Sequence, residues 1–106
     1  NKIMKPEKFG PYFWKIIHMI SFEYPNNPTR KEKTDHINFI LSLQFILPCK
    51  QCRHNLSKTL KRMKFKETDM KNKNTFSRFC VDLHNEVNKE LGKPIVSYSS
   101  VYNMYM

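Results

Sequence analysis

The strongest constraint on the fold is a run of apolar side chains that recur with the period of an α-helix near the C-terminus. Six of them share one face of a helix, at Phe76, Phe79, Cys80, Leu83, Val87 and Leu91. Asn74 or Thr75 can cap the start of this helix, and Gly92 followed by Pro94 is typical of its end. The segment therefore predicts a helix with one buried side.

Two further helices are predicted in the first half of the chain. The first opens at residues 9–14, with Pro11 in its first turn, and ends by Tyr24-Pro25. The second begins after Thr29, which forms a capping-box pattern with Glu32, and Pro48 ends it. Apolar residues on several sides of the second helix predict that much of its circumference is buried.

The third predicted helix starts at or next to Cys49. Its apolar positions are Cys49, Cys52, Leu56, Leu60 and Met63, so both sulfurs lie on the apolar side near the helix N-terminus. Residues 64–74 are polar and predict a loop, and residues 97–106 predict a short last helix. The sequence shows no convincing pair of strands. We therefore predict an all-α fold, a four-helix bundle with a short fifth C-terminal helix, as a single domain over residues 1–106.

The formal net charge is +10, with dense basic stretches at residues 30–33 and 58–73. Such a charge bears on solubility and on anionic partners, not on the fold. Neither zinc-finger spacing nor aromatic-interleaved strands accompany it, so solvated helix faces are favoured over nucleic-acid binding. No apolar run approaches the roughly 18 residues of a membrane-spanning helix, so we expect no membrane partner.

The motif Cys49-Lys50-Gln51-Cys52 permits three roles: a redox-active disulfide, a metal site, or core packing. The helix N-terminus, Lys50 and Arg53 would stabilise a thiolate here. A closed zinc site needs four ligands, and the nearby His54 points elsewhere on the helix. We expect no resident metal, although a non-enzymatic zinc-binding or interaction module remains the alternative. Cys80 lies within an apolar stripe and predicts core packing.

Two histidines lie beside groups that suit a planar heteroaromatic ligand. Trp14 precedes His18 by one helical turn, and Asn85 and Asn88 surround His84. A histidine at the edge of an apolar face is more often an ordinary boundary residue, so ligand binding and a structural role both stay open.

Together these motifs resemble the Erv/ALR family of FAD-linked sulfhydryl oxidases. The matching segments are Gly10 with residues 14–18, Tyr24-Pro25, residues 48–52, and above all residues 84–94 (HNEVNKELGKP). Their order and spacing agree across residues 9–105. The compact form most resembles the oxidases of large cytoplasmic DNA viruses.

The resemblance implies a helical bundle that holds FAD against the cysteine pair, usually as a homodimer. Cys49 would exchange with incoming thiols and Cys52 would face the flavin, so these two are the implied catalytic residues. The implied cofactor-binding residues are Gly10, Trp14, His18, Cys52, Val81, His84, Asn85, Val87, Asn88, Lys93 and Tyr105. Electrons would pass from a thiol protein substrate, or a thioredoxin-like relay protein, to FAD and then to molecular oxygen, giving hydrogen peroxide.

The departures from the family pattern also carry expectations. Many cellular members join the fourth helix to the C-terminal segment by a disulfide, and Val81 and Tyr98 stand at those positions here. The 106 residues contain no second cysteine pair that could act as a shuttle. The implied location is the host cytoplasm or the virion for a viral member, and the mitochondrial intermembrane space for a cellular one.

Overall fold

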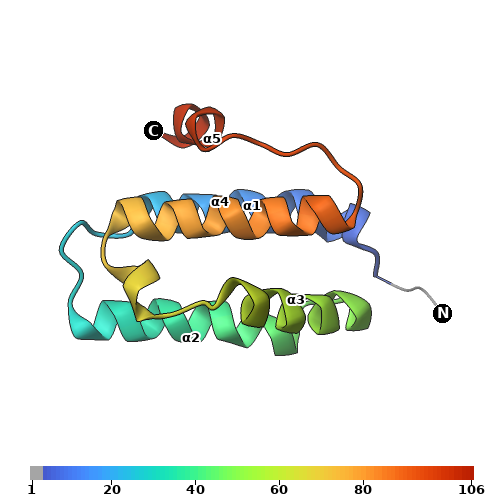
Figure 1. Cartoon of the computed structure of the whole chain (residues 1–106), viewed down its shortest axis with the longest axis horizontal. Helices are drawn as coiled ribbons and strands as arrows, with labels where there is room; N and C mark the ends of the chain where they lie inside the picture. The colour runs from blue at the N-terminus through green and yellow to red at the C-terminus, as the bar shows by residue number, and fades with distance from the viewer. Residues whose placement is uncertain (1–3) are drawn as a thin grey trace.

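The chain forms a helical bundle, seen in a computed structural model that describes residues 4–106 (Figure 1). The elements are α1 (Pro6–Glu23), α2 (Arg30–Ile46), α3 (Lys50–Met63), the 3₁₀ helix η1 (Glu67–Met70), α4 (Lys73–Glu90) and α5 (Tyr98–Tyr105). Helix α4 packs along α1, α3 packs against α2 and α4, and α5 lies on the outer side of the α1–α4 pair. The predicted all-α class is confirmed. The predicted domain boundary includes residues 1–3, which lie outside the described residues.

Helix α1 begins earlier than the sequence predicted. Pro6 takes the first-turn position that was expected for Pro11, and Pro11 lies inside the helix. A proline in the helix interior removes the hydrogen bond to the carbonyl four residues earlier, here that of Glu7. Glu7 is exposed, so water can satisfy its carbonyl and the helix continues.

The predicted capping box of α2 is confirmed, but its burial was predicted wrongly. Thr29 Oγ1 accepts a hydrogen bond from the Glu32 amide at 3.1 Å, and the Thr29 amide donates to Glu32 Oε1 at 2.8 Å. Helix α2 packs on α3 and η1 with one side only, where Ile40 and Leu43 are buried. Three large apolar side chains, Leu41, Phe45 and Ile46, are exposed on the others.

The boundary between the predicted loop and α4 also differs. Asn72 caps α4, since its Oδ1 accepts from the Thr75 amide at 2.9 Å. The predicted loop contains η1, whose Met70 is fully buried. At the other end, Gly92 has a φ of 68° and ends α4 with a hydrogen bond from the Lys93 amide to the Asn88 carbonyl, as predicted for a glycine stop.

The main core is closed where α1 ends and α4 begins. Tyr24, Met70 and Phe76 are almost fully buried there, and the Tyr24 hydroxyl donates to the Met70 carbonyl at 2.7 Å. Cys80 is also fully buried, as predicted, and burial raises the pKa of its thiol. Within residues 4–106, no helix is long and apolar enough to cross a membrane.

Candidate active site

The site is built around the cysteine pair at the start of α3. Cys49 is the N-cap of α3, and it forms a disulfide with Cys52 across a Cα–Cα distance of 5.1 Å. The Cys52 amide donates a hydrogen bond to Cys49 Sγ at 3.1 Å. Of the three roles that the motif permits, the structure therefore supports the disulfide.

Arg53 fixes the turn that leads into the disulfide. Its Nη1 donates to the Leu47 carbonyl at 2.5 Å, which ties the first turn of α3 back to the end of α2. Pro48 lies between these two points and ends α2, as the sequence predicted. The hydrogen bond from Arg53 to Leu47 thus fixes the backbone on both sides of Cys49.

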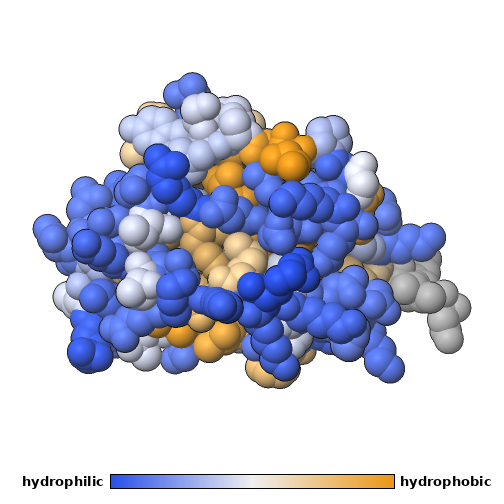
Figure 2. Space-filling view, in the orientation of Figure 1, coloured by the Kyte–Doolittle hydropathy of each residue, from blue (hydrophilic) through white to orange (hydrophobic). Residues whose placement is uncertain are grey.

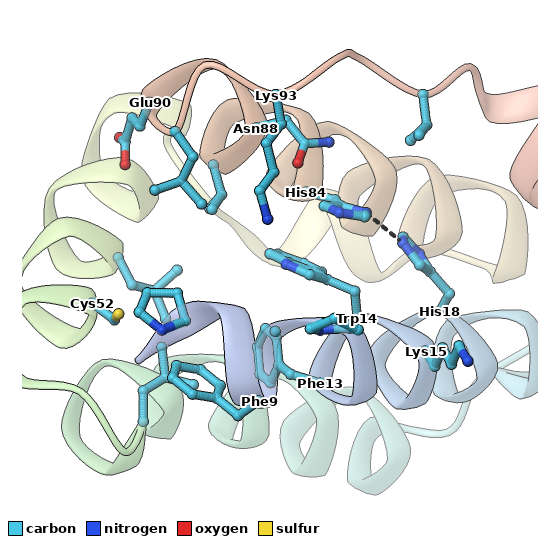
Figure 3. A pocket seen from close by; sticks show the side chains of 18 of the residues that line it. Phe9, Phe13, Trp14, Lys15, His18, Cys52, His84, Asn88, Glu90 and Lys93 are labelled. Atoms are coloured by element: carbon cyan, nitrogen blue, oxygen red, sulfur yellow. Dashed lines mark hydrogen bonds between the residues drawn. The ribbon is translucent and has the colours of Figure 1, made fainter. Parts of the chain in front are cut away.

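A cavity of about 350 Å³ lies beside the disulfide, between the first half of α1, α3, the end of α4 and the C-terminal segment (Figure 3). Its size is within the range of small-molecule and cofactor sites. The sulfur of Cys52 lies at one side of it, whereas Cys49 is not among its lining residues. The predicted site residues that line it are Gly10, Trp14, His18, Cys52, His84, Val87, Asn88, Lys93 and Tyr105.

Aromatic rings from α1 and α4 form one wall of the cavity. The Trp14 and His84 rings are stacked, with centroids 4.2 Å apart and planes inclined by 10°. His18 Nε2 and His84 Nδ1 share a hydrogen bond of 3.0 Å (Figure 3). Flat rings arranged in this way favour a ligand that is itself flat and aromatic.

Both histidines are held neutral at physiological pH. Burial lowers the pKa of His18 to about 4. Burial also lowers the pKa of His84 to about 4, with further contributions from His18 and Lys93. Two neutral imidazoles can share a hydrogen bond because one nitrogen of each ring donates and the other accepts.

One polar atom of this pair lacks a partner. His18 Nδ1 is buried and makes no hydrogen bond within the described part of the chain. A buried polar atom without a partner costs free energy, and His18 is among the residues that line the cavity. The stacked rings, the apolar lining and this unpaired nitrogen together fit a planar cofactor with polar edges.

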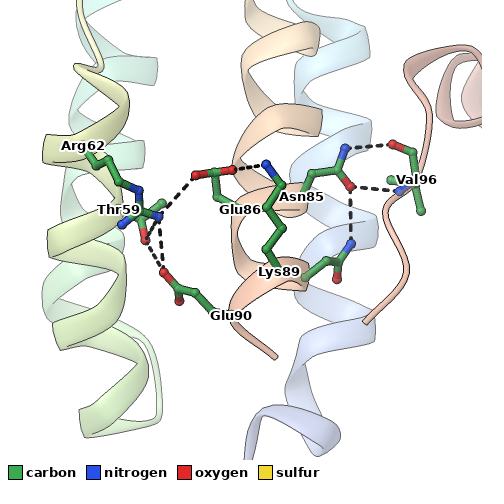
Figure 4. Close-up of polar contacts among 8 residues, drawn as sticks. Thr59, Arg62, Asn85, Glu86, Lys89, Glu90 and Val96 are labelled. Carbon is green, nitrogen blue, oxygen red and sulfur yellow. Dashed lines mark hydrogen bonds and ion pairs between the residues drawn. The ribbon is translucent and has the colours of Figure 1, made fainter. Parts of the chain in front are cut away.

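Two predicted cofactor contacts lie elsewhere. Val81 packs with Phe22 and Val101 in a small core beneath α5. Asn85 donates from Nδ2 to the Val96 carbonyl at 2.8 Å and accepts from the Val96 amide at 2.9 Å (Figure 4). Neither residue is among those that line the cavity, so their contacts to a cofactor stay predictions, while the structure assigns Asn85 to holding the segment between α4 and α5.

The cavity also includes residues that the sequence did not single out as site residues. Phe9 and Phe13 lie on α1 near Trp14, and Asn55 and Leu56 follow Cys52 by three and four residues on α3. Asn55 and Leu56 could have been found from the sequence, because residues three and four apart share a helix face and these two therefore lie on the side of Cys52. Met104 comes from α5, and only the tertiary path of the C-terminal segment brings it here.

The fold and the site define a class of protein: a helical bundle with a disulfide-forming cysteine pair at the edge of a cavity for a flat cofactor. Among residues 4–106, no group of three or more histidine, cysteine, aspartate or glutamate side chains is arranged to hold a metal ion.

Comparison with known proteins agrees with this class. Residues 11–106 match the Erv1 / Alr family. The chain is 34% identical over 97 residues to an FAD-linked sulfhydryl oxidase of African swine fever virus, covering 92% of this chain and 79% of that protein. This protein belongs to the Erv1 / Alr family.

Other relatives extend the comparison. A probable FAD-linked sulfhydryl oxidase of Acanthamoeba polyphaga mimivirus is 32% identical over 90% of this chain, which spans 66% of that relative's length. A putative FAD-linked sulfhydryl oxidase of Invertebrate iridescent virus 6 is also 32% identical, over 89% of this chain and 88% of that protein. The yeast Erv1 core structure has the same fold, with a TM-score of 0.86, 23% identity, and coverage of 99% of this chain and 86% of that one.

Proposed function

We propose that this protein is an FAD-linked sulfhydryl oxidase that forms disulfide bonds in partner proteins. The observation that carries the proposal is the position of the Cys49–Cys52 disulfide, whose inner sulfur lines the same cavity as the stacked Trp14 and His84 rings. Membership of the Erv1 / Alr family supports it.

The two sulfurs take different roles because they differ in position. A substrate thiolate attacks Cys49 Sγ, the disulfide breaks, and Cys52 leaves as the thiolate that faces the cavity. A second substrate thiolate then attacks the mixed disulfide and releases Cys49. The Cys52 amide, which donates to Cys49 Sγ, stabilises the Cys49 thiolate as it leaves. Two electrons have then passed from the substrate to the pair, and the substrate holds a new disulfide.

The cavity residues would hold FAD, which when bound takes the electron pair from the Cys52 side and passes it to dioxygen, giving hydrogen peroxide. Trp14 and His84 offer ring faces, His18 offers its unpaired Nδ1, and Asn88 offers an amide. Lys93 brings a positive charge to the cavity and suits the anionic groups of the cofactor. Because both histidines are neutral, each ring can donate or accept a hydrogen bond without carrying a charge.

The partners follow from the same chemistry. The substrate is a protein with a pair of thiols, or a thioredoxin-like relay protein that delivers electrons to Cys49. We also propose a homodimer, supported by apolar side chains that the single chain leaves exposed. They come from α1 and α2: Tyr12, Ile16, Met19, Leu41, Phe45 and Ile46. Sedimentation equilibrium tests this assignment, and a Phe45→Glu variant should shift the protein towards the monomer.

The test of the activity begins with the purified protein. We expect the visible absorption spectrum of a bound flavin and consumption of oxygen when dithiothreitol is added. A protein with neither property would contradict the proposal, and stoichiometric zinc in place of flavin would favour the zinc-binding alternative. The similarity to viral relatives supports a viral source, and fractionation of infected cells would test the predicted cytoplasmic or virion location.

A further inference from the structure

The exposed side of α3 carries a line of basic residues that begins next to the exchanging sulfur. Lys50, His54, Lys58 and Lys61, here called the basic stripe, follow one another at intervals of four, four and three residues. This spacing places them along one side of the helix. All four are exposed, while Leu56, Thr59 and Leu60 are buried on the other side of α3. In Figure 2 the surface over α3 is mostly hydrophilic.

The lysines of the stripe are not neutralised by the chain itself. In the part of the chain that the structure describes, the lysines and arginines in ion pairs are Lys31, Arg62 and Lys89. Residues 36–66 include no aspartate or glutamate. Across the helix interface, Glu86 and Glu90 of α4 are engaged by Arg62 (Figure 4).

This arrangement is unfavourable for the isolated helix. Like charges three or four residues apart, such as Lys58 and Lys61 or Lys50 and Arg53, destabilise a helix by a few tenths of a kcal/mol per pair. The positive end of the helix dipole lies at the same place as Lys50, which adds to the positive potential. An anionic ligand along the stripe would remove this cost.

We infer that the basic stripe is the docking surface for an acidic polypeptide segment that brings the substrate thiols to Cys49. The inference rests on the proposed function and narrows its substrate class. An extended segment lying on α3 would have one end at the disulfide, because the stripe begins one residue after Cys49. Residues 49–63 include no phenylalanine, tyrosine or tryptophan on which a base could stack, and this favours an acidic protein over a single-stranded nucleic acid.

The chemistry of the docked segment needs no further reagent. Its first thiolate forms a bond to Cys49 Sγ as the Cys49–Cys52 bond breaks, and its second thiolate displaces Cys49. The segment is oxidised by two electrons and the cysteine pair is reduced by two. Charge complementarity acts on the encounter and on the lifetime of the complex rather than on these bond changes.

The test compares two synthetic peptides with the same dithiol core, one flanked by aspartate and glutamate and the other by lysine. With the flavin-loaded wild-type protein at low salt, we expect kcat/KM to be about tenfold or more higher for the acidic peptide. The difference should shrink as sodium chloride is added, because salt screens exposed charges. Equal rates for the two peptides would overturn the inference.

A matched pair of variants locates the effect. Lys58→Glu with Lys61→Glu reverses the stripe, and Arg30→Glu with Lys71→Glu reverses two exposed charges elsewhere to the same net charge. We expect the stripe variant to lose most of the preference for the acidic peptide and the control to keep it. Both should oxidise dithiothreitol at the wild-type rate. If the control variant loses the preference equally, net charge alone explains the preference and the docking surface is overturned.

Binding without turnover separates this inference from the proposed function. Fluorescence anisotropy with the acidic peptide, its cysteines replaced by serine, measures docking even if dithiothreitol oxidation fails. If the protein binds the peptide through the basic stripe but does not oxidise dithiothreitol, the result counts against the proposed oxidase activity and not against the docking surface. Tighter binding of a short single-stranded oligonucleotide, lost in the stripe variant, would overturn the acidic-polypeptide proposal in favour of nucleic acid.

Discussion

The two ends of the bundle use the same pair of helices in opposite ways. Where α1 ends and α4 begins, aromatic rings close the core: Tyr24 packs edge-to-face on Phe76, with centroids 5.0 Å apart. Where α1 begins and α4 ends, Trp14 and His84 stack against each other and border a cavity. The closed end supplies stability, and the open end supplies a site with one buried nitrogen, His18 Nδ1, that has no hydrogen-bond partner among the described residues.

The sharpest test of the open end replaces the cysteines. Cys49→Ser and Cys52→Ser should each reduce dithiol oxidation to background, because each removes one sulfur of the exchanging pair. Oxygen uptake measures the loss, and the flavin absorbance of each variant should be retained because the rings that hold the cofactor are unchanged. A variant without flavin would instead assign the disulfide to maintaining the cavity.

The closed end should respond through stability. Phe76→Ala removes a buried ring and should lower the free energy of unfolding by about 3–5 kcal/mol, measured by urea denaturation of the cofactor-free protein. Phe9→Ala, at a half-buried position beside the cavity, should cost clearly less but weaken cofactor binding. Equal losses of stability at the two positions would contradict the division between the ends.

Lowering the pH should destabilise the open end of the bundle, where His18 and His84 lie. The pKa of His18 and of His84 is about 4 in the folded protein, and an unfolded histidine has a pKa near 6.5. Between these values the unfolded state binds more protons, so stability falls as the pH is lowered from 6.5 to 4, by about a few kcal/mol.

Urea midpoints measured across this pH range test the expectation. His18→Asn should remove part of the pH dependence. A wild-type midpoint that does not change between pH 6.5 and 4 would show that the histidine pair titrates normally and is open to water.

The smallest effect concerns the segment between α4 and α5. Asn85→Ala removes both hydrogen bonds to Val96 and should cost about 1–2 kcal/mol. Hydrogen exchange at the Val96 amide should become faster, while exchange in the first turns of α4 stays slow. Asn38→Ala, at an exposed position, is the control. Unchanged exchange at Val96 would argue that other contacts hold this segment.

Sequence periodicity predicted those features of the two ends of the bundle that depend on one helix alone. The apolar stripes predicted the four long helices. Asn88 was singled out beside His84 as a group suited to a planar ligand, and both residues line the cavity. Periodicity did not show that Val81 and Asn85, also four residues apart, face the C-terminal segment instead. That distinction depends on the path of residues 92–97, which no helical pattern describes.

Other differences have equally physical causes. Which side of α2 stays exposed depends on which helices pair with it, so Phe45 could not be told from a core residue. Asn72 and Thr75 are both residue types that cap helices well. Which of them becomes the N-cap of α4 depends on where η1 ends. Conversely, the glycine stop at Gly92 was predictable because a positive φ strongly favours glycine.

The attachment of α5 to α4 at Val81 and Tyr98 is noncovalent. Val81 packs beneath α5, the Tyr98 hydroxyl hydrogen-bonds to Ser77 Oγ at 2.8 Å, and the Arg78 guanidinium lies 4.0 Å from the centre of the Tyr98 ring. With Cys80 buried and unpaired, the chain contains one reducible bond, Cys49–Cys52, in the described residues. Reduction of the Cys49–Cys52 bond therefore leaves the attachment of α5 intact, because apolar packing, a hydrogen bond and a cation–π contact hold it.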